Sequence, residues 1–328
     1  MRTIRSMLLV FGGLLAIMAL AERACAQAYP SRPITLIAPW PAGGAIDGLC
    51  RLLGPKLSDR LGQPVVIENR PGASSIVGVA AGSRAAPDGY TLVMAGSGSL
   101  AIAPTAYSKL SYDPTKDFAP VAAVAWIPFV LVVNPAVPVH SVADLIKYAK
   151  EKPGQLNFGS GGPGSPHHLL TEMFKSMTGI EMAHVPYKGS APALNDVVGG
   201  HIQLLFSDPL PSLPQIRAGT VRALGVSTLK RWPTAPDIPT LAESGVPGYD
   251  AAGWGMIAVP AATPKDIVTR LHTELAGVIA SPEVQDQVLK LGMLPAASMA
   301  REELQPFINS EMERWGRIVK QVGLAGTM

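Results

Sequence analysis

The chain has 328 residues, and its 27 lysines and arginines against 24 aspartates and glutamates give a formal net charge of +3 at pH 7. Only 16% of the residues are charged, which argues against nucleic-acid binding because that function needs a strongly basic surface. The two cysteines are too few for a cysteine-based zinc cluster.

Residues 1–26 have the layout of a secretory signal peptide. Arg2 and Arg5 form a short cationic region, and residues 7–21 form an apolar run that is short for a membrane span. The small residues at positions 24–26 form an A-x-A site. We therefore predict export and cleavage near Ala26, with a retained membrane anchor as the alternative.

Cleavage would change the net charge, the number of cysteines and the length of the mature chain. The signal carries three arginines and one glutamate, so the formal net charge falls from +3 to +1. Cys50 becomes the single thiol, and we expect it to be a small buried apolar residue. The roughly 300 residues that remain exceed one comfortable hydrophobic core and predict two lobes.

The first predicted unit is strand, loop, helix, strand. Residues 34–38 form an apolar, β-rich run, and a loop rich in glycine and proline follows. Residues 48–61 place leucines on one helical face, although Pro55 is expected to kink or interrupt that helix. Gly62 ends the helix, and residues 65–68 form the next strand.

A second unit has the same order of elements. Residues 156–158 form a short strand, and a glycine- and proline-rich loop leads into a helix at 167–177. Gly179 ends that helix, and residues 180–185 form the next strand. The two units share this order but have no close residue repeat.

Further elements complete the pattern. Strands are predicted at 91–94, 128–133, 204–206, 222–226 and 256–260. Helices are predicted at 142–150, 191–199, 264–280, 282–290 and 301–322. Strands that alternate with helices predict an α/β protein, with two mostly parallel sheets flanked by helices.

The loop at 159–164 spells G-x-G-x-x-G, the fingerprint of a dinucleotide-binding turn, and Glu181 lies about 20 residues further on. The same glycines also suit an anion cradle, because a helix N-terminus offers free N–H groups and partial positive charge. Pro163 and Pro166 favour the cradle, since they stiffen the loop and start the helix. An exported enzyme that binds a dinucleotide here stays open as the alternative.

Catalytic and metal-binding motifs are missing from the sequence. Neither H-E-x-x-H nor G-x-S-x-G occurs, and no spacing of serine, histidine and aspartate predicts a triad. His167 and His168 are adjacent, so they point to different sides of a helix and cannot bind one metal ion together. We predict no catalytic residue, no metal and no cofactor.

Several phrases occur together in one order: YPSRPITLIAPWPAGGAID, LGQPVVIENRPGA, AAPDGYTLVMAG, LSYDPTKDFAPV, HVPYKG and RALGVSTLKRWPTAPDIPTLAESGVPGYD. With them the chain resembles the substrate-binding proteins of the tripartite tricarboxylate transporter family, often called Bug receptors. The resemblance runs from about Tyr29 to the C-terminus. It implies a two-lobed, type II-like periplasmic binding protein with a ligand cleft between its lobes.

The resemblance also implies how the chain is divided and what it binds. Lobe 1 would comprise residues 27–127 with 250–328, and lobe 2 residues 128–249. The ligand would be a small carboxylate, and the partner a two-part integral membrane transporter. A sensory receptor that signals to a membrane partner without transport stays open. The receptor is expected to be a monomer in the periplasm.

The family's ligand loops map onto loops of both lobes. In lobe 1 they give Trp40, Pro41, Ala42, Gly43, Gly44, Asp47, Ser74, Ser75, Ser97, Gly98 and Ser99. In lobe 2 they give Ser160, Gly161, Gly164, Ser165, His168, Tyr187 and Asp208. For Asp47 a charge in the first helical turn is an equally good interpretation. For His168 the alternative is a helix-start residue satisfied locally.

Two positions depart from the pattern that the resemblance implies. Ile46 stands where a small polar residue such as threonine is expected, and Ala103 stands where asparagine is expected. Both changes predict a more apolar pocket in lobe 1, which disfavours a densely carboxylated ligand such as citrate. The hypothesis is a ligand with one or two carboxylates and an apolar or aromatic body.

Overall fold

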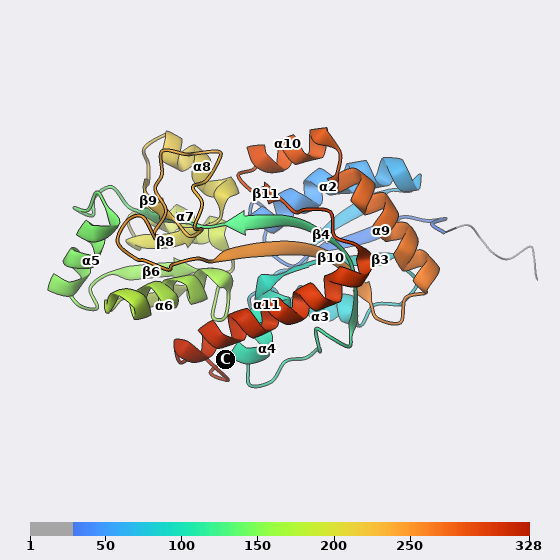
Figure 1. The fold of residues 1–328 in the computed structure, drawn as a ribbon, viewed down its shortest axis with the longest axis horizontal. Coiled ribbons are helices and arrows are strands. Elements are labelled where there is room, and N and C mark those ends of the chain that lie inside the picture. The colour runs from blue at the N-terminus through green and yellow to red at the C-terminus, as the bar shows by residue number, and fades with distance from the viewer. Residues whose placement is uncertain (1–28) are drawn as a thin grey trace, which may run out of the picture.

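A computed structural model describes residues 29–328, so the predicted signal peptide and its cleavage site lie outside the described residues. Figure 1 shows an elongated molecule built around a six-stranded and a five-stranded sheet, both flanked by helices. The expected α/β class with two sheets is confirmed. Within residues 29–328, the helices are all too short or too polar to cross a membrane.

The six-stranded sheet has the order β11-β4-β10-β3-β1-β2. Its strands are β1 (Ile34–Ala38), β2 (Val65–Asn69), β3 (Thr91–Gly96), β4 (Phe118–Pro128), β10 (Ala252–Pro260) and β11 (Leu294–Pro295). The helices of this part are α2 (Ala45–Leu61), α3 (Ile76–Ser83), η1 (Gly98–Ile102), α4 (Ala103–Ala106), α9 (Lys265–Ile279), α10 (Pro282–Lys290) and α11 (Arg301–Gln321).

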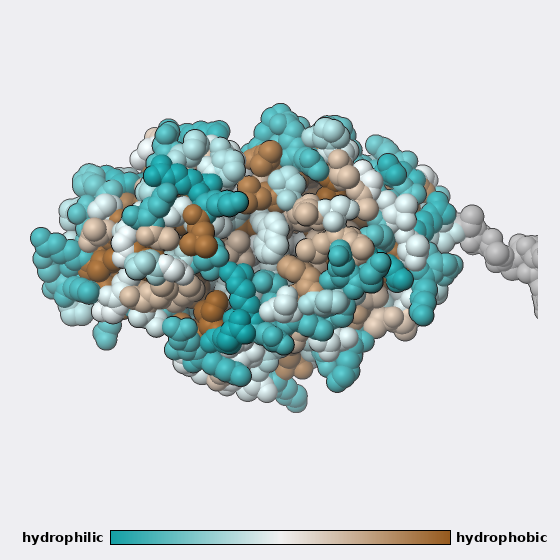
Figure 2. All heavy atoms as spheres, viewed as in Figure 1, coloured by the Kyte–Doolittle hydropathy of each residue, from teal (hydrophilic) through white to brown (hydrophobic). Residues whose placement is uncertain are grey.

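The five-stranded sheet has the order β7-β6-β8-β5-β9. Its strands are β5 (Val130–Val133), β6 (Asn157–Ser160), β7 (Ala183–Pro186), β8 (Leu204–Ser207) and β9 (Arg222–Val226). The helices are α5 (Val142–Glu151), α6 (Pro166–Thr178), α7 (Ser190–Val198) and α8 (Pro209–Arg217). Figure 2 shows mostly hydrophilic side chains on one face of the molecule, with apolar residues in small separate patches.

The prediction of mostly parallel sheets was wrong, because both sheets are mixed. β1 is parallel to β2 and β3, but β10 is antiparallel to β3 and β4. β6 is parallel to β7 and β8, but β5 is antiparallel to β8 and β9. The long strand β4, absent from the prediction, carries the chain toward the second sheet, and β10 brings it back in the opposite direction.

The chain passes between the sheets at two places that lie side by side. Phe129 alone separates β4 from β5, and the return passes through Ala251 just before β10. Ser227 joins the two crossings: its N–H donates to the Phe129 carbonyl at 2.9 Å, and its carbonyl accepts the Ala251 N–H at 2.8 Å. The division into lobes at residues 127 and 250 stays a prediction.

Helix α2 runs unbroken from Ala45 to Leu61, so the predicted kink or interruption at Pro55 does not divide it. The proline removes one helical hydrogen bond. A buried face that includes Leu49, Leu53 and Leu57 outweighs that loss by packing against the first sheet. The helix places its N-terminus at the centre of the molecule.

A buried histidine, His168, and a half-buried one, His184, support the loop between β6 and α6. The rings of His168 and His184 stack at a centroid distance of 4.1 Å, and both stack on Phe158. Nδ1 of His168 accepts the Gly164 N–H at 3.3 Å, and Nε2 of His184 lies 2.6 Å from the Ser160 hydroxyl. Burial lowers the pKa of each histidine to about 4, with nearby positive charge as a smaller cause.

Because the pKa values of these histidines are lowered in the folded protein, we expect the protein to lose stability in mild acid. The folded pKa values are depressed, so between about pH 6.5 and pH 4 the unfolded chain binds protons that the folded protein does not. We expect the free energy of unfolding to fall by about 2 kcal/mol for His168 between pH 7 and pH 5, measured by urea titration. His168→Phe should flatten this dependence, and His140→Phe, an exposed control, should keep it. Equal slopes for the two variants would contradict the assignment.

Candidate functional site

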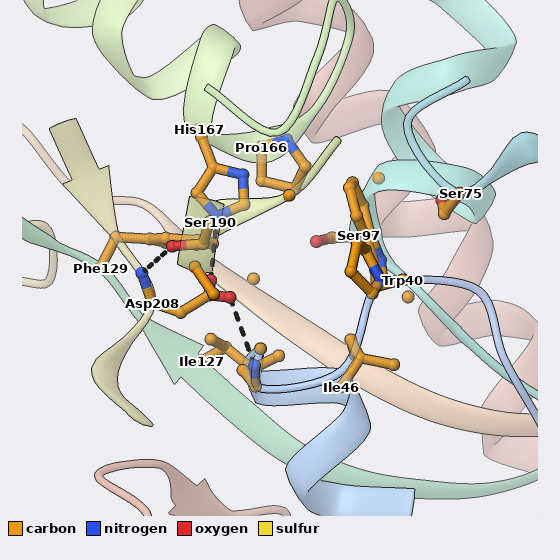
Figure 3. A pocket seen from close by; sticks show the side chains of 18 of the residues that line it. Trp40, Ile46, Ser75, Ser97, Ile127, Phe129, Pro166, His167, Ser190 and Asp208 are labelled. Atoms are coloured by element: carbon orange, nitrogen blue, oxygen red, sulfur yellow. Dashed lines mark hydrogen bonds and ion pairs between the residues drawn. The ribbon is translucent and has the colours of Figure 1, made fainter. Parts of the chain in front are cut away.

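A pocket lies between the two sheets, and residues from both parts of the chain line it. Figure 3 shows Trp40, Ile46 and Ser97 on one side, and His167, Ser190 and Asp208 on the other. Pockets at the junction of two parts of a chain are frequent sites for small molecules. The pocket is therefore the leading candidate for a binding site.

Four helices begin at this pocket. Their N-cap residues are Gly44 for α2, Ser165 for α6, Gly189 for α7 and Asp208 for α8. The first-turn N–H groups of a helix have no helical partner, and each N-terminus carries about half a positive charge. Since no lysine or arginine is among the described residues that line the pocket, its positive potential comes from the backbone.

Asp208 links the two sides of the pocket. Its Oδ2 accepts the Ala45 N–H of α2 at 3.3 Å, and its Oδ1 lies 2.9 Å from Nε2 of His167 (Figure 3). The side chain is only 8% exposed. One carboxylate therefore joins the start of α2, which packs on the first sheet, to α6 and α8, which pack on the second.

Further hydrogen bonds cross the seam, which is the boundary around the pocket where loops from the two parts of the chain meet. The Pro163 carbonyl accepts the Ser74 hydroxyl at 2.6 Å and the Tyr107 hydroxyl at 3.0 Å. At another point Nε1 of Trp232 donates to the Gly292 carbonyl at 2.7 Å. Loops from the two parts of the chain thus touch at separated points around the pocket.

The loop before α3 is conformationally strained. Ala73, Ser74 and Ser75 have φ values of 44°, 53° and 81°, in the left-handed region that disfavours side chains. Such backbone is retained only where surrounding contacts hold it, and it is frequent at ligand sites. Here Ser74 contacts Pro163 across the seam and Ser75 lines the pocket.

Half of the predicted ligand-binding residues line the pocket. These nine are Trp40, Pro41, Ala42, Gly44, Ser75, Ser97, Gly98, Ser99 and Asp208. The structure places nine others outside the lining: Gly43, Asp47, Ser74, Ser160, Gly161, Gly164, Ser165, His168 and Tyr187. Ligand contact by each of the eighteen stays a prediction. Of the two departures from the family pattern, Ile46 lines the pocket, whereas Ala103 is buried in α4 away from it.

Asp47 organises the loop before α2. Its carboxylate accepts the Gly43 N–H at 3.0 Å, the Arg51 guanidinium at 2.9 Å and the Asn69 amide at 2.9 Å. Asn69 also donates to the Trp40 carbonyl. Burial alone would raise the pKa of Asp47, but these hydrogen bonds outweigh it and hold the pKa below its usual value. The interpretation as a first-turn charge therefore describes this residue.

The loop at 159–164 packs behind the pocket without lining it. Gly161 lies against its wall, because a Cβ atom there would be 3.1 Å from the Trp40 ring and 3.0 Å from Nδ1 of His167. Gly162 packs against Ser74 in the same way, at 2.8 Å. This close approach across the seam leaves the loop no open groove for a pyrophosphate, so the dinucleotide alternative is not favoured.

Two predicted side chains point elsewhere. The histidine at the pocket is His167, and His168 stacks on His184 on the other side of α6. The hydroxyl of Tyr187 donates to Asp196 at 2.7 Å, and burial, aided by Asp196, raises its pKa to about 12. His168 and Tyr187 therefore lie outside the pocket lining, and contact of either residue with a ligand stays a prediction.

Sequence reasoning missed several lining residues. Ser190 begins α7 directly after the PYKG segment, and its hydroxyl accepts the Asp208 N–H at 3.0 Å. Phe129 stands at the crossing from β4 to β5 and packs on His167. Gly189, directly before Ser190, could have indicated a helix start in the sequence. No feature of the sequence indicated that Phe129 lies where the chain crosses between the sheets. Within residues 29–328, no cluster of three or more metal-binding side chains occurs.

Comparisons with known proteins agree with this geometry. The sequence pattern of the tripartite tricarboxylate transporter family receptor matches residues 49–324. The protein BugT of Bordetella pertussis is 35% identical over 97% of each chain. An R. palustris protein solved with adipate is 40% identical, with a TM-score of 0.88 over 90% of this chain and 99% of that one.

Two other solved structures are similar. The periplasmic binding protein BugD is 32% identical, with a TM-score of 0.86 over 90% of this chain and 99% of that one. MatC from Rhodopseudomonas palustris, solved with malate, is 29% identical, with a TM-score of 0.84 over 89% of this chain and 100% of that one. The chain belongs to the receptors of the tripartite tricarboxylate transporter family.

Proposed function

We propose that the protein is a periplasmic receptor that encloses a small carboxylate between its two lobes and delivers it to an integral membrane transporter. The observation that carries this proposal is the convergence of four helix N-termini on one pocket without a lysine or arginine in its lining. Such a pocket favours an anion over a cation or a neutral molecule. The adipate and malate bound by two relatives are ligands of the same chemical class.

The lining supports a ligand with an apolar or aromatic body. Trp40, Ile46, Ile127, Phe129 and Trp254 present apolar surface to the pocket. The polar groups that line the pocket at the helix N-termini can bind one or two carboxylates. A third carboxylate, as in citrate, would lie against apolar side chains and lose its hydrogen bonds to water. The pocket is suited to binding, and we assign it no catalytic residue.

A ligand panel tests the proposed class. We expect one or more of acetate, adipate, glutamate, benzoate and terephthalate to raise the melting temperature of residues 27–328, and citrate to bind more weakly. Ligand at a hundred times its dissociation constant adds about 2.7 kcal/mol, or a few degrees for a protein of this size. NAD and NADP serve as controls. A shift with a nucleotide alone, or tightest binding by citrate, would contradict the proposal.

Ile46→Thr tests the apolar part of the pocket. The substitution removes apolar surface, so we expect binding of an aromatic or aliphatic carboxylate to weaken about 3- to 10-fold. Citrate should lose less, because threonine adds a polar group. Isothermal titration measures both, and Ile318→Thr on α11, away from the pocket, is the matched control. Equal losses for both ligands would argue that Ile46 does not select among them.

Ser74→Ala tests the closed form. The Ser74 hydroxyl bonds the Pro163 carbonyl across the seam, so its loss should weaken closure and hence ligand affinity by about 2- to 10-fold. Ser108→Ala is the control, because that hydroxyl bonds Met328 within the same part of the chain. Unchanged affinity in Ser74→Ala would show that this bond does not contribute to the bound state.

A further inference from the structure

Glu311 on α11 is a buried carboxylate for which the proposed function gives no role. The residue is only 7% exposed. Its Oε2 accepts hydrogen bonds from Nε1 of Trp254 at 2.8 Å and from Nε1 of Trp315 at 3.0 Å. Its Oε1 accepts a hydrogen bond from the Arg314 guanidinium at 3.4 Å. Because taking a charge out of water is costly, a buried carboxylate of this kind points to a role beyond stability.

One of the two indoles belongs to the pocket. Trp254 lies on β10 and lines the pocket, whereas Trp315 lies on α11 outside the lining. Helix α11 runs beside β10 (Figure 1), and its Phe307 packs edge-on against the Trp254 ring at 5.2 Å between centroids. The hydrogen bond from Trp254 to Glu311 therefore ties the wall of the pocket to a helix that contributes none of the described lining residues.

The same carboxylate also acts on the chain just before β10. Arg314, which bonds Oε1 of Glu311, donates to the Asp250 carbonyl at 3.1 Å. Asp250 lies directly before the return crossing between the sheets. Glu311 thus holds residues 250–254 at both ends, directly at Trp254 and through Arg314 at Asp250.

The segment held in this way packs closely against other parts of the pocket wall. Gly253 lines the pocket, and a Cβ atom there would be 3.2 Å from the Phe129 ring and 3.2 Å from the Ser97 hydroxyl. The Trp254 carbonyl lies even closer to β3, since a Cβ atom on Gly96 would be 2.5 Å from it. All of these residues line the pocket. A small shift of the segment would therefore change the shape of the pocket.

We propose that Glu311 is a positioning residue of the binding site. It fixes residues 250–254, and with them the pocket wall that meets the ligand, without touching the ligand itself. An apolar side chain in its place would leave two indole N–H groups unpaired and release Arg314. A wall that is held before the ligand arrives costs less to order on binding, so loss of the anchor lowers affinity. The inference rests on the proposed function, since it needs a ligand in this pocket.

Two tryptophan variants separate positioning from stability. Trp254→Phe and Trp315→Phe each remove one hydrogen bond to the same carboxylate oxygen, so both should lower the free energy of unfolding to a similar extent in a urea titration. Only Trp254→Phe should weaken binding, by about 3- to 10-fold, in isothermal titration with the tightest-binding member of the carboxylate panel. Trp315→Phe is the matched control. Equal losses of affinity in both variants, or a loss in neither, would overturn the role of Glu311.

A double-mutant cycle tests whether Glu311 acts through Trp254. Glu311→Leu should weaken binding at least as much as Trp254→Phe, and the double variant should bind no more weakly than Glu311→Leu alone. Glu311→Gln keeps an oxygen for both indoles and should bind within about 2-fold of the wild-type protein. Losses that add in the double variant would show that Trp254 acts independently of Glu311, which contradicts the proposal.

The outcomes distinguish this inference from the proposed function. Carboxylate binding by the wild-type protein, with unchanged affinity in Trp254→Phe, overturns the role of Glu311 and leaves the proposed function standing. Binding by no member of the panel overturns both. If Glu311→Leu does not fold, the two tryptophan variants decide.

Discussion

The structure depends on holding an anion in an enclosed space without a lysine or arginine beside it. Helices α2, α6, α7 and α8 begin around one pocket, and their N-termini supply positive potential there. The first-turn N–H groups come mainly from α2 and α7, because Pro166 starts α6 and Pro209 and Pro211 lie in the first turn of α8. Glycines at two of the N-caps, Gly44 and Gly189, let the backbone come close. Backbone groups are fixed by the fold, so they need little reorganisation when a ligand binds.

Closure follows from the same arrangement. The helix N-termini come from both parts of the chain, so the positive potential is strongest only when the two parts meet. Asp208 holds the start of α2 against α6, and the Pro163 carbonyl holds two hydroxyls from the other side. The strained backbone at Ala73–Ser75 lies at this seam. Ser227 joins the two crossings by its backbone hydrogen bonds to Phe129 and Ala251.

The fold was largely predictable because hydrophobic periodicity marks buried strands and amphipathic helices. The ends of α2 and α6 at Gly62 and Gly179 follow from their left-handed caps. Strand direction was not predictable, since an apolar run reads the same in parallel and antiparallel pairs. Pro55 failed as a helix breaker because tertiary packing of α2 outweighed one lost hydrogen bond.

The sequence predicted which loops lie near the site better than it predicted which side chains line the pocket. Most residues of the glycine-rich loop at 40–44 line the pocket, whereas no residue of the loop at 159–164 does. Asp208, which came from the family resemblance, also lines it. The choice between His167 and His168 depended on a rotation of about 100° around α6, which the sequence alone does not specify. Phe129 and Ser190 reach the pocket through a crossing and a helix start that only the three-dimensional arrangement defines.

The most direct measurement is a crystal structure of residues 27–328 soaked with the tightest-binding carboxylate. We expect a closed protein with a ligand carboxylate on the first-turn N–H groups of α2 or α7, and the ligand body against Trp40 and Phe129. A carboxylate held by surface lysines or arginines, with the pocket between the sheets left empty, would contradict it.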